Sequence, residues 1–120
     1  MILNLTPHPV RIYADDRPDG IDDLEPGLRV VLEPEDTPAR LSTVPVGGLR
    51  REVRYGIPIE TIEFGSACNL PDPHDGICYV VSLPVALALV RHRSDLLVPY
   101  REVRNASGTV IGCRQLAQPV

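Results

Sequence analysis

Arginine is the residue type in this sequence best suited to holding a charged ligand. All twelve basic side chains are arginine, and each guanidinium is a planar fork that can hold a phosphate through two hydrogen bonds. Five of them lie in the apolar segment 77–116: Arg91, Arg93, Arg101, Arg104 and Arg114. Their concentration predicts a site for a small phosphorylated ligand, with Tyr79 or Tyr100 stacking on a base. A GC-rich genome is the simpler explanation for the use of arginine alone.

A second set of polar residues lies in a proline-flanked segment near the start of the chain. Pro7 and Pro9 force the residues before them, Thr6 and His8, into extended geometry. The segment is therefore stiff, and we expect Asn4, Thr6 and His8 to add directional polar contacts to the same ligand. A His8 that only packs or caps a turn is the alternative.

Cysteine chemistry offers a different function, in which Cys113 is a nucleophile and His8 is its base. The neighbouring Arg114 would lower the pKa of the thiol, as nearby cations do. Against this hypothesis, the sequence shows no third group that orients the histidine. A buried structural cysteine is the commoner outcome for such a residue.

The sequence contains no recognisable metal or cofactor motif. Cys68, His74 and Cys78 have a C-x5-H-x3-C spacing, which matches no common zinc pattern and has no fourth ligand nearby. The pair Gly47-Gly48 lacks the lysine and the strand–turn–helix context of a phosphate-binding loop. We therefore expect a non-catalytic protein that uses no metal and no cofactor.

The charge distribution bears on the partners of the protein. The net charge of −4 argues against a nucleic-acid polymer, which requires a clearly basic face. Residues 1–36 hold nine acids against three arginines, whereas residues 37–120 hold seven acids against nine arginines. A local basic site on an acidic protein follows from this asymmetry.

Several features predict a cytoplasmic protein that does not bind membranes. No apolar run approaches the ~20 residues that span a bilayer, and Met1–Leu5 is too short for a signal peptide. The three cysteines are odd in number and far apart, which does not fit a disulfide framework.

The elements that must position the arginines are a strand, a helix and a hairpin. Ile77–Val81 is a continuous apolar run, typical of a strand buried on both faces. Ser82 stands at the N-cap of a predicted helix over Leu83–Arg93, whose apolar residues surround its axis. Such a helix is covered on most sides or lies in a subunit interface. Tyr100–Arg104 and Thr109–Gln115 are the predicted arms of a hairpin.

The remaining apolar segments predict short strands over Ile2–Leu5, Val10–Tyr13, Leu28–Leu32, Arg40–Val46, Arg51–Tyr55 and Ile57–Phe64. Together these elements predict one α+β domain over residues 1–120, mainly β: a small antiparallel sheet or a partly open barrel with one short buried helix. Residues 14–27 form a solvated acidic loop, and residues 117–120 form a tail. We expect a homo-oligomer, with the ligand site at a subunit interface. A structural or protein-binding module that uses the apolar helix as its partner surface is a further alternative.

Four motifs carry a resemblance to known proteins: Asn4–His8, Tyr79–Ser82, Asp95–Pro99 and Val103–Arg114. Jointly they resemble a largely uncharacterised family of small phage, prophage and actinobacterial proteins, and the likeness leaves out the acidic loop. In size and layout the chain is also similar to phage anti-defence sponges, which are oligomers that sequester cyclic nucleotide or cyclic ADP-ribose signals. The residues with which those proteins contact their ligands do not match this sequence one by one, so the resemblance implies no site residues.

Overall fold

The structure is a computed structural model that describes residues 1–48 and 52–120. The predicted strand start at Arg51 lies outside the described residues. The described chain forms, in order, β1 (Ile2–Asn4), β2 (Val10–Tyr13), β3 (Leu28–Leu32), β4 (Arg40–Pro45), β5 (Glu52–Arg54), β6 (Ile57–Ile59), β7 (Ile62–Cys68), β8 (Cys78–Val80), α1 (Leu83–Leu89), β9 (Leu96–Arg104) and β10 (Val110–Ala117).

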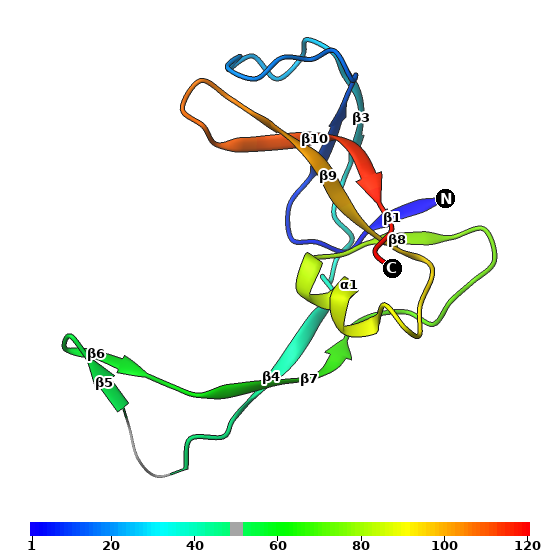
Figure 1. The fold of residues 1–120 in the computed structure, drawn as a ribbon. Coiled ribbons are helices and arrows are strands. Elements are labelled where there is room, and N and C mark those ends of the chain that lie inside the picture. The colour runs from blue at the N-terminus through cyan, green and yellow to red at the C-terminus, as the bar shows by residue number, and fades with distance from the viewer. Residues whose placement is uncertain (49–51) are drawn as a thin grey trace.

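Six strands form one sheet that curls into a nearly closed barrel, in the order β1-β8-β9-β10-β2-β3 (Figure 1). The end of β3 returns to β1 through a bridge between Asn4 and Pro34, where the Glu35 N–H donates to the Asn4 carbonyl at 2.8 Å. The predicted fold, mainly β with a partly open barrel and one short helix, is confirmed.

The sheet is mixed, so the small antiparallel sheet that the sequence offered as one possibility is not what forms. Strand β8 runs parallel to both of its neighbours, β1 and β9, and β10 runs parallel to β2. The pairs β9–β10 and β2–β3 are antiparallel. Alternation of apolar and polar residues reports which face of a strand is buried and carries no information about the direction of its neighbour.

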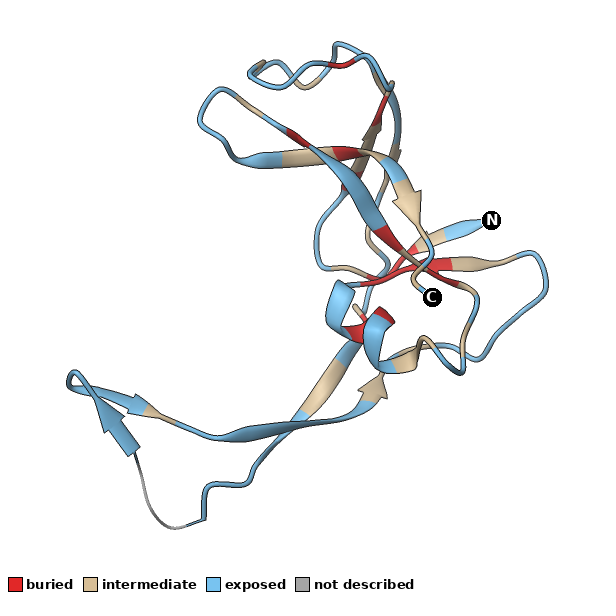
Figure 2. Ribbon diagram, viewed as in Figure 1, coloured by how far each residue is buried: buried red, intermediate tan, exposed pale blue. Residues whose placement is uncertain are grey.

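The core lies inside the barrel and beneath the helix. The three residues Tyr79, Val80 and Val81 are almost wholly buried, which confirms the predicted central strand. Tyr79 and Val81 pack with Val85 and Ala86 of α1 and with Leu96 of β9, whereas Val80 packs with Val10 and Cys113 in a second cluster. Figure 2 shows buried residues on the barrel strands and on one side of the helix.

The helix is shorter and less covered than predicted. It ends at Leu89 rather than Arg93, because the chain must turn at once to bring Leu96 beside Tyr79. Only Val85 and Ala86 are buried, and Leu83 and Leu87 are 53% and 55% exposed. The expectation of a helix covered on most sides is therefore wrong within one chain.

Two hairpins extend from the barrel as an arm, defined here as residues 40–48 and 52–68. Strands β4 and β7 form a two-stranded ribbon, and β5 and β6 form a second one at its tip (Figure 1). The strand predicted over Ile57–Phe64 is interrupted at Glu60 and Thr61, so it forms the separate strands β6 and β7. The arm raises the Cα radius of gyration to 17.4 Å, against about 14 Å for a compact chain of this length.

The C-terminal strand runs further than predicted. Ala117 pairs with Val98 in the β9–β10 ladder, so the tail begins at Gln118.

Candidate functional site

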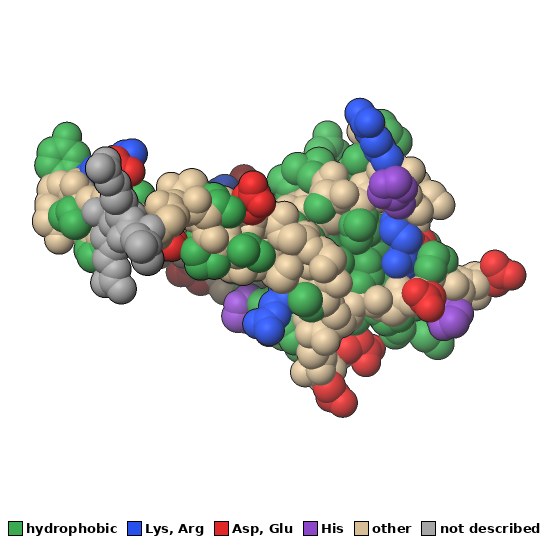
Figure 3. All heavy atoms as spheres, turned by 90° about the horizontal axis from the view of Figure 1, so that it is seen from below, with side chains coloured by type: hydrophobic (Ala, Val, Ile, Leu, Met, Phe, Trp, Pro, Cys, Tyr) green, Lys and Arg blue, Asp and Glu red, His purple; other side chains and the backbone are tan. Residues whose placement is uncertain are grey.

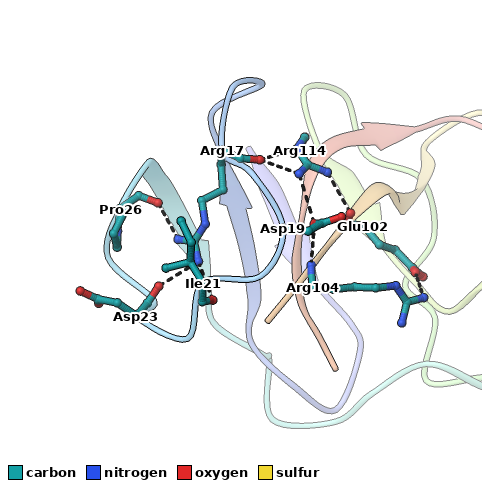
Figure 4. A network of polar contacts seen from close by, with 8 residues as sticks. All are labelled: Arg17, Asp19, Ile21, Asp23, Pro26, Glu102, Arg104 and Arg114. Atoms are coloured by element: carbon teal, nitrogen blue, oxygen red, sulfur yellow. Dashed lines mark hydrogen bonds and ion pairs between the residues drawn. The ribbon is translucent and has the colours of Figure 1, made fainter. Parts of the chain in front are cut away.

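Three of the predicted ligand-binding arginines lie together on the β9–β10 hairpin. We call Arg101 and Arg104 of β9 and Arg114 of β10 the arginine cluster. The acidic loop meets them: Asp15 Oδ1 is 3.0 Å from Arg101 Nη1, and Asp19 Oδ1 is 3.3 Å from Arg114 Nη2. Figure 4 shows Asp19 between the Arg104 backbone and the Arg114 side chain. The cluster is thus already occupied by carboxylates of its own chain.

Arg114 is the structural member of the cluster. Its side chain is 13% exposed, and its guanidinium donates to the carbonyls of Arg17 and Glu102 as well as to Asp19. These bonds tie the acidic loop to the hairpin. The hydrogen bond from the backbone N–H of Arg104 makes the largest contribution to lowering the pKa of Asp19, and the Arg114 guanidinium lowers it further. The carboxylate therefore stays charged and stays bound to the hairpin.

Arg101 and Arg104 are the accessible members. Arg104 donates to Glu102 and to the Gly108 carbonyl at 2.8 Å each, on the surface. Arg101 has a φ of 58°, a left-handed conformation that is uncommon for a residue other than glycine. Its side chain is 42% exposed, and Tyr100 beside it in the chain is also exposed. This pair can reach a ligand without disturbing the core.

Arg17 is the residue that sequence reasoning missed. It is 3% exposed, and its guanidinium lies 4.6 Å from the centroid of the Tyr13 ring. Its fork donates to the carbonyls of Pro26, Ile21 and Asp23 at 2.6, 3.1 and 2.8 Å (Figure 4). The acidic side chains of the loop are exposed as expected, but its backbone is organised around this buried cation. A single arginine between acids was the only sequence signal.

The opening segment serves the closure of the barrel. Asn4 is 1% exposed. Its Nδ2 donates to the carbonyls of His8 and Leu32, and its Oδ1 accepts from the N–H and the hydroxyl of Thr6. Every hydrogen-bonding position of the Asn4 amide has a partner within the chain. The side chain of His8 is exposed, and its carbonyl is held by Asn4.

The other predicted contacts lie in the core or at the end of the helix. Tyr79 is buried in the core, and Arg91 is exposed beyond α1. Arg93 makes a two-pronged ion pair with Asp95, at 2.8 Å for each bond, and also donates to the Pro71 carbonyl. The structure therefore places three of the arginines on one hairpin, whereas Arg93 is paired with Asp95 and Arg91 is exposed elsewhere on the surface.

The ion pair between Arg93 and Asp95 makes stability depend on pH. The hydrogen bond from Arg93 lowers the pKa of Asp95 from its ordinary value. Because the pKa of Asp95 is lower in the folded protein than in the unfolded chain, the ionised carboxylate stabilises the fold at pH values above its unfolded pKa. This contribution is lost as the pH falls through its folded pKa. We expect Asp95→Asn to lower the free energy of unfolding by about 1–2 kcal/mol at pH 7 and to have little effect near pH 2. Urea denaturation at both pH values measures the difference.

The control for this prediction is Asp36→Asn, since Asp36 is exposed on a loop. It should match the unmodified protein at both pH values. If Asp95→Asn lost equal stability at pH 7 and pH 2, the ionised carboxylate of Asp95 would not be the source of the stability that the substitution removes.

Cys113 lies in β10 with no exposed surface, and burial raises the pKa of its thiol. The thiol is therefore neutral near pH 7, and a neutral thiol is a poor nucleophile. Arg114, the expected activator, directs its guanidinium to Arg17, Glu102 and Asp19 instead. Nothing in this arrangement favours the cysteine-dependent enzyme.

Two further findings concern the described part of the chain. Within residues 1–48 and 52–120, no group of three or more histidine, cysteine or acidic side chains is placed to hold a metal ion. Over the same residues, no helix has both the length and the apolar character to cross a membrane.

Comparison with protein-family models, with curated proteins and with solved structures finds no match to this chain.

Proposed function

We propose that this chain is a non-catalytic binding protein for a small phosphorylated ligand, which it contacts through Arg101, Arg104 and Tyr100. The observation that carries the proposal is the backbone of Arg101. A left-handed arginine costs on the order of 1 kcal/mol or more, and such strain concentrates at functional sites. Here it presents an exposed guanidinium at the edge of an arginine cluster.

The present partner of Arg101 is easily replaced. The Asp15 side chain is 72% exposed, and an ion pair between exposed side chains contributes only about 0–1 kcal/mol. A phosphate group carries more charge and accepts two parallel bonds from one guanidinium. It therefore competes well for Arg101, while Asp19 remains held by the Arg104 backbone and Arg114.

The same geometry supports a site completed by a second copy of the chain. In one chain the residues predicted to bind the ligand are divided among the hairpin, the opening segment and the end of the helix. The exposed ones are His8, Arg91, Tyr100, Arg101 and Arg104. An oligomer brings such groups from different copies to one ligand. The resemblance to phage sponges directs the choice of ligand to cyclic nucleotides and cyclic ADP-ribose, which the protein would sequester in the cytoplasm without altering them.

Isothermal titration calorimetry with cyclic dinucleotides and cyclic ADP-ribose isomers tests the proposal. We expect binding by the unmodified protein, at least tenfold weaker binding by Arg101→Gln, and unchanged binding by Arg29→Gln. Arg29 is a matched control because it is exposed on β3, outside the cluster. Chromatography of the released ligand should recover it intact. No heat with any member of the panel, at tens of micromolar protein, removes the proposal.

A further inference from the structure

The arm exposes a large amount of apolar surface. Its uncovered apolar side chains are between 44% and 102% exposed: Val44, Val46, Val53, Tyr55, Ile57, Ile62 and Phe64. Figure 3 shows apolar groups along the projecting arm, and Figure 2 shows the ribbon exposed over most of its length. These residues lie on both faces of the ribbon, since Val44 pairs with Glu63 and the neighbouring Thr43 pairs with Phe64.

A free ribbon of this kind is not a stable end state in water. An isolated two-stranded hairpin is marginally stable and needs a third strand or a helix packed on it. Both edges of the β4–β7 ribbon also lack a neighbouring strand among the described residues. Exposed edges combined with exposed apolar faces are the surfaces through which chains associate.

The area of this surface fits a protein partner. At roughly 150–250 Å² for a large side chain, the exposed fractions amount to on the order of 700 Å² of apolar surface, near the ~800 Å² that each partner contributes to a standard interface. The area is divided between the two faces of the β4–β7 ribbon and the hairpin at its tip, so a partner on one face covers part of it.

The body of the same chain carries a second uncovered apolar surface, on α1. Leu83 and Leu87 are four residues apart, so they form one stripe along the helix. The opposite side, with Val85 and Ala86, is buried in the core. A helix with this uncovered stripe is the kind of element that an exposed ribbon requires.

We propose that the arm packs on a second copy of this chain, with its ribbon against Leu83 and Leu87 of that copy's α1. The outer part of the arm does not cover its own helix, because the β4–β7 ribbon contacts α1 only near the barrel and then projects away from it (Figure 1). An exchange between two copies related by a two-fold axis covers one face of each arm and both helices at once. In a closed symmetric dimer of this kind each copy gives one arm and receives one, so the contact does not propagate to further copies.

Size-exclusion chromatography with light scattering tests the dimer over a hundredfold range of protein concentration. We expect the unmodified chain at twice its mass of 13.2 kDa and the double variant Ile62→Glu, Phe64→Glu at the single-chain mass. Val110→Glu is the control, since Val110 lies on the barrel and is as exposed as Ile62, and it should remain dimeric. Unmodified protein at 13.2 kDa throughout the range, or a dimer that persists in the double variant, overturns the proposal.

A variant on the other side of the interface tests which surface receives the arm. Leu87→Glu lies on the helix and should weaken the dimer at least tenfold, as the arm variant does. An unchanged dimer in Leu87→Glu overturns the assignment to α1. Circular dichroism of each variant must show the strand content of the unmodified barrel, which we expect because all four substituted side chains are exposed in the single chain.

Discussion

Replacing Arg17 with alanine is expected to lower the free energy of unfolding by about 3–5 kcal/mol. The reason is the number of carbonyls that this one side chain holds. Its fork donates to Pro26, Ile21 and Asp23 from a buried position, and a polar group left buried without a partner costs about 1–3 kcal/mol. The midpoint and slope of urea denaturation at pH 7 measure the loss.

Two further variants separate the geometry of Arg17 from its charge. Arg17→Lys keeps the cation but has no planar fork to bridge the carbonyls, so we expect an intermediate loss. Arg29→Ala removes an exposed arginine and should change stability by less than about 0.5 kcal/mol. If Arg17→Ala were as stable as Arg29→Ala, water would be replacing the guanidinium and the loop would not depend on it.

Replacing Gly112 with alanine should cost about 3 kcal/mol, because there is no room for a methyl group. Gly112 lies in β10 beside β2, and an added Cβ would collide with the Arg11 carbonyl oxygen and would lie 2.8 Å from Tyr13 Cε2. Both are part of the barrel, so relief requires the two strands to separate. Thermal unfolding followed by circular dichroism measures the effect.

The control for Gly112 is Gly47→Ala in the arm. The added Cβ there would approach Thr61 at 3.7 Å, an ordinary contact, so we expect no measurable change in the unfolding temperature of the barrel. An unfolding temperature for Gly112→Ala within 1 °C or so of the unmodified protein would mean that the β2–β10 contact adjusts at small cost.

The sequence predicted the positions of the strands better than it predicted which strands pair with one another. The bounds of β2 and β3 agree with the prediction, because both are short apolar segments between turn residues. The helix was predicted too long, since Val90–Arg93 suits a helix but the return to β9 requires a turn there. Strand pairing and direction depend on contacts between distant segments, which local periodicity does not contain.

The candidate site was predicted in part. The concentration of arginine in residues 77–116 pointed to Arg101, Arg104 and Arg114, which the structure places on one hairpin. The burial of Arg17 was not predictable, because its partners are backbone carbonyls, which every sequence possesses. The exposure of Val44 and Phe64 in the arm was equally hidden, since an apolar strand has the same sequence pattern whether it meets its own core or another chain.

The pairing of the first strands with the last part of the chain has a consequence for synthesis. Ile2 pairs with Cys78, and Ile12 pairs with Cys113. Contacts so distant along the chain make folding slow, because a long loop must close before they form. On the ribosome, β2 can pair with β3 early, but the sheet that joins β10 to β2 is completed only after residue 113 has been translated.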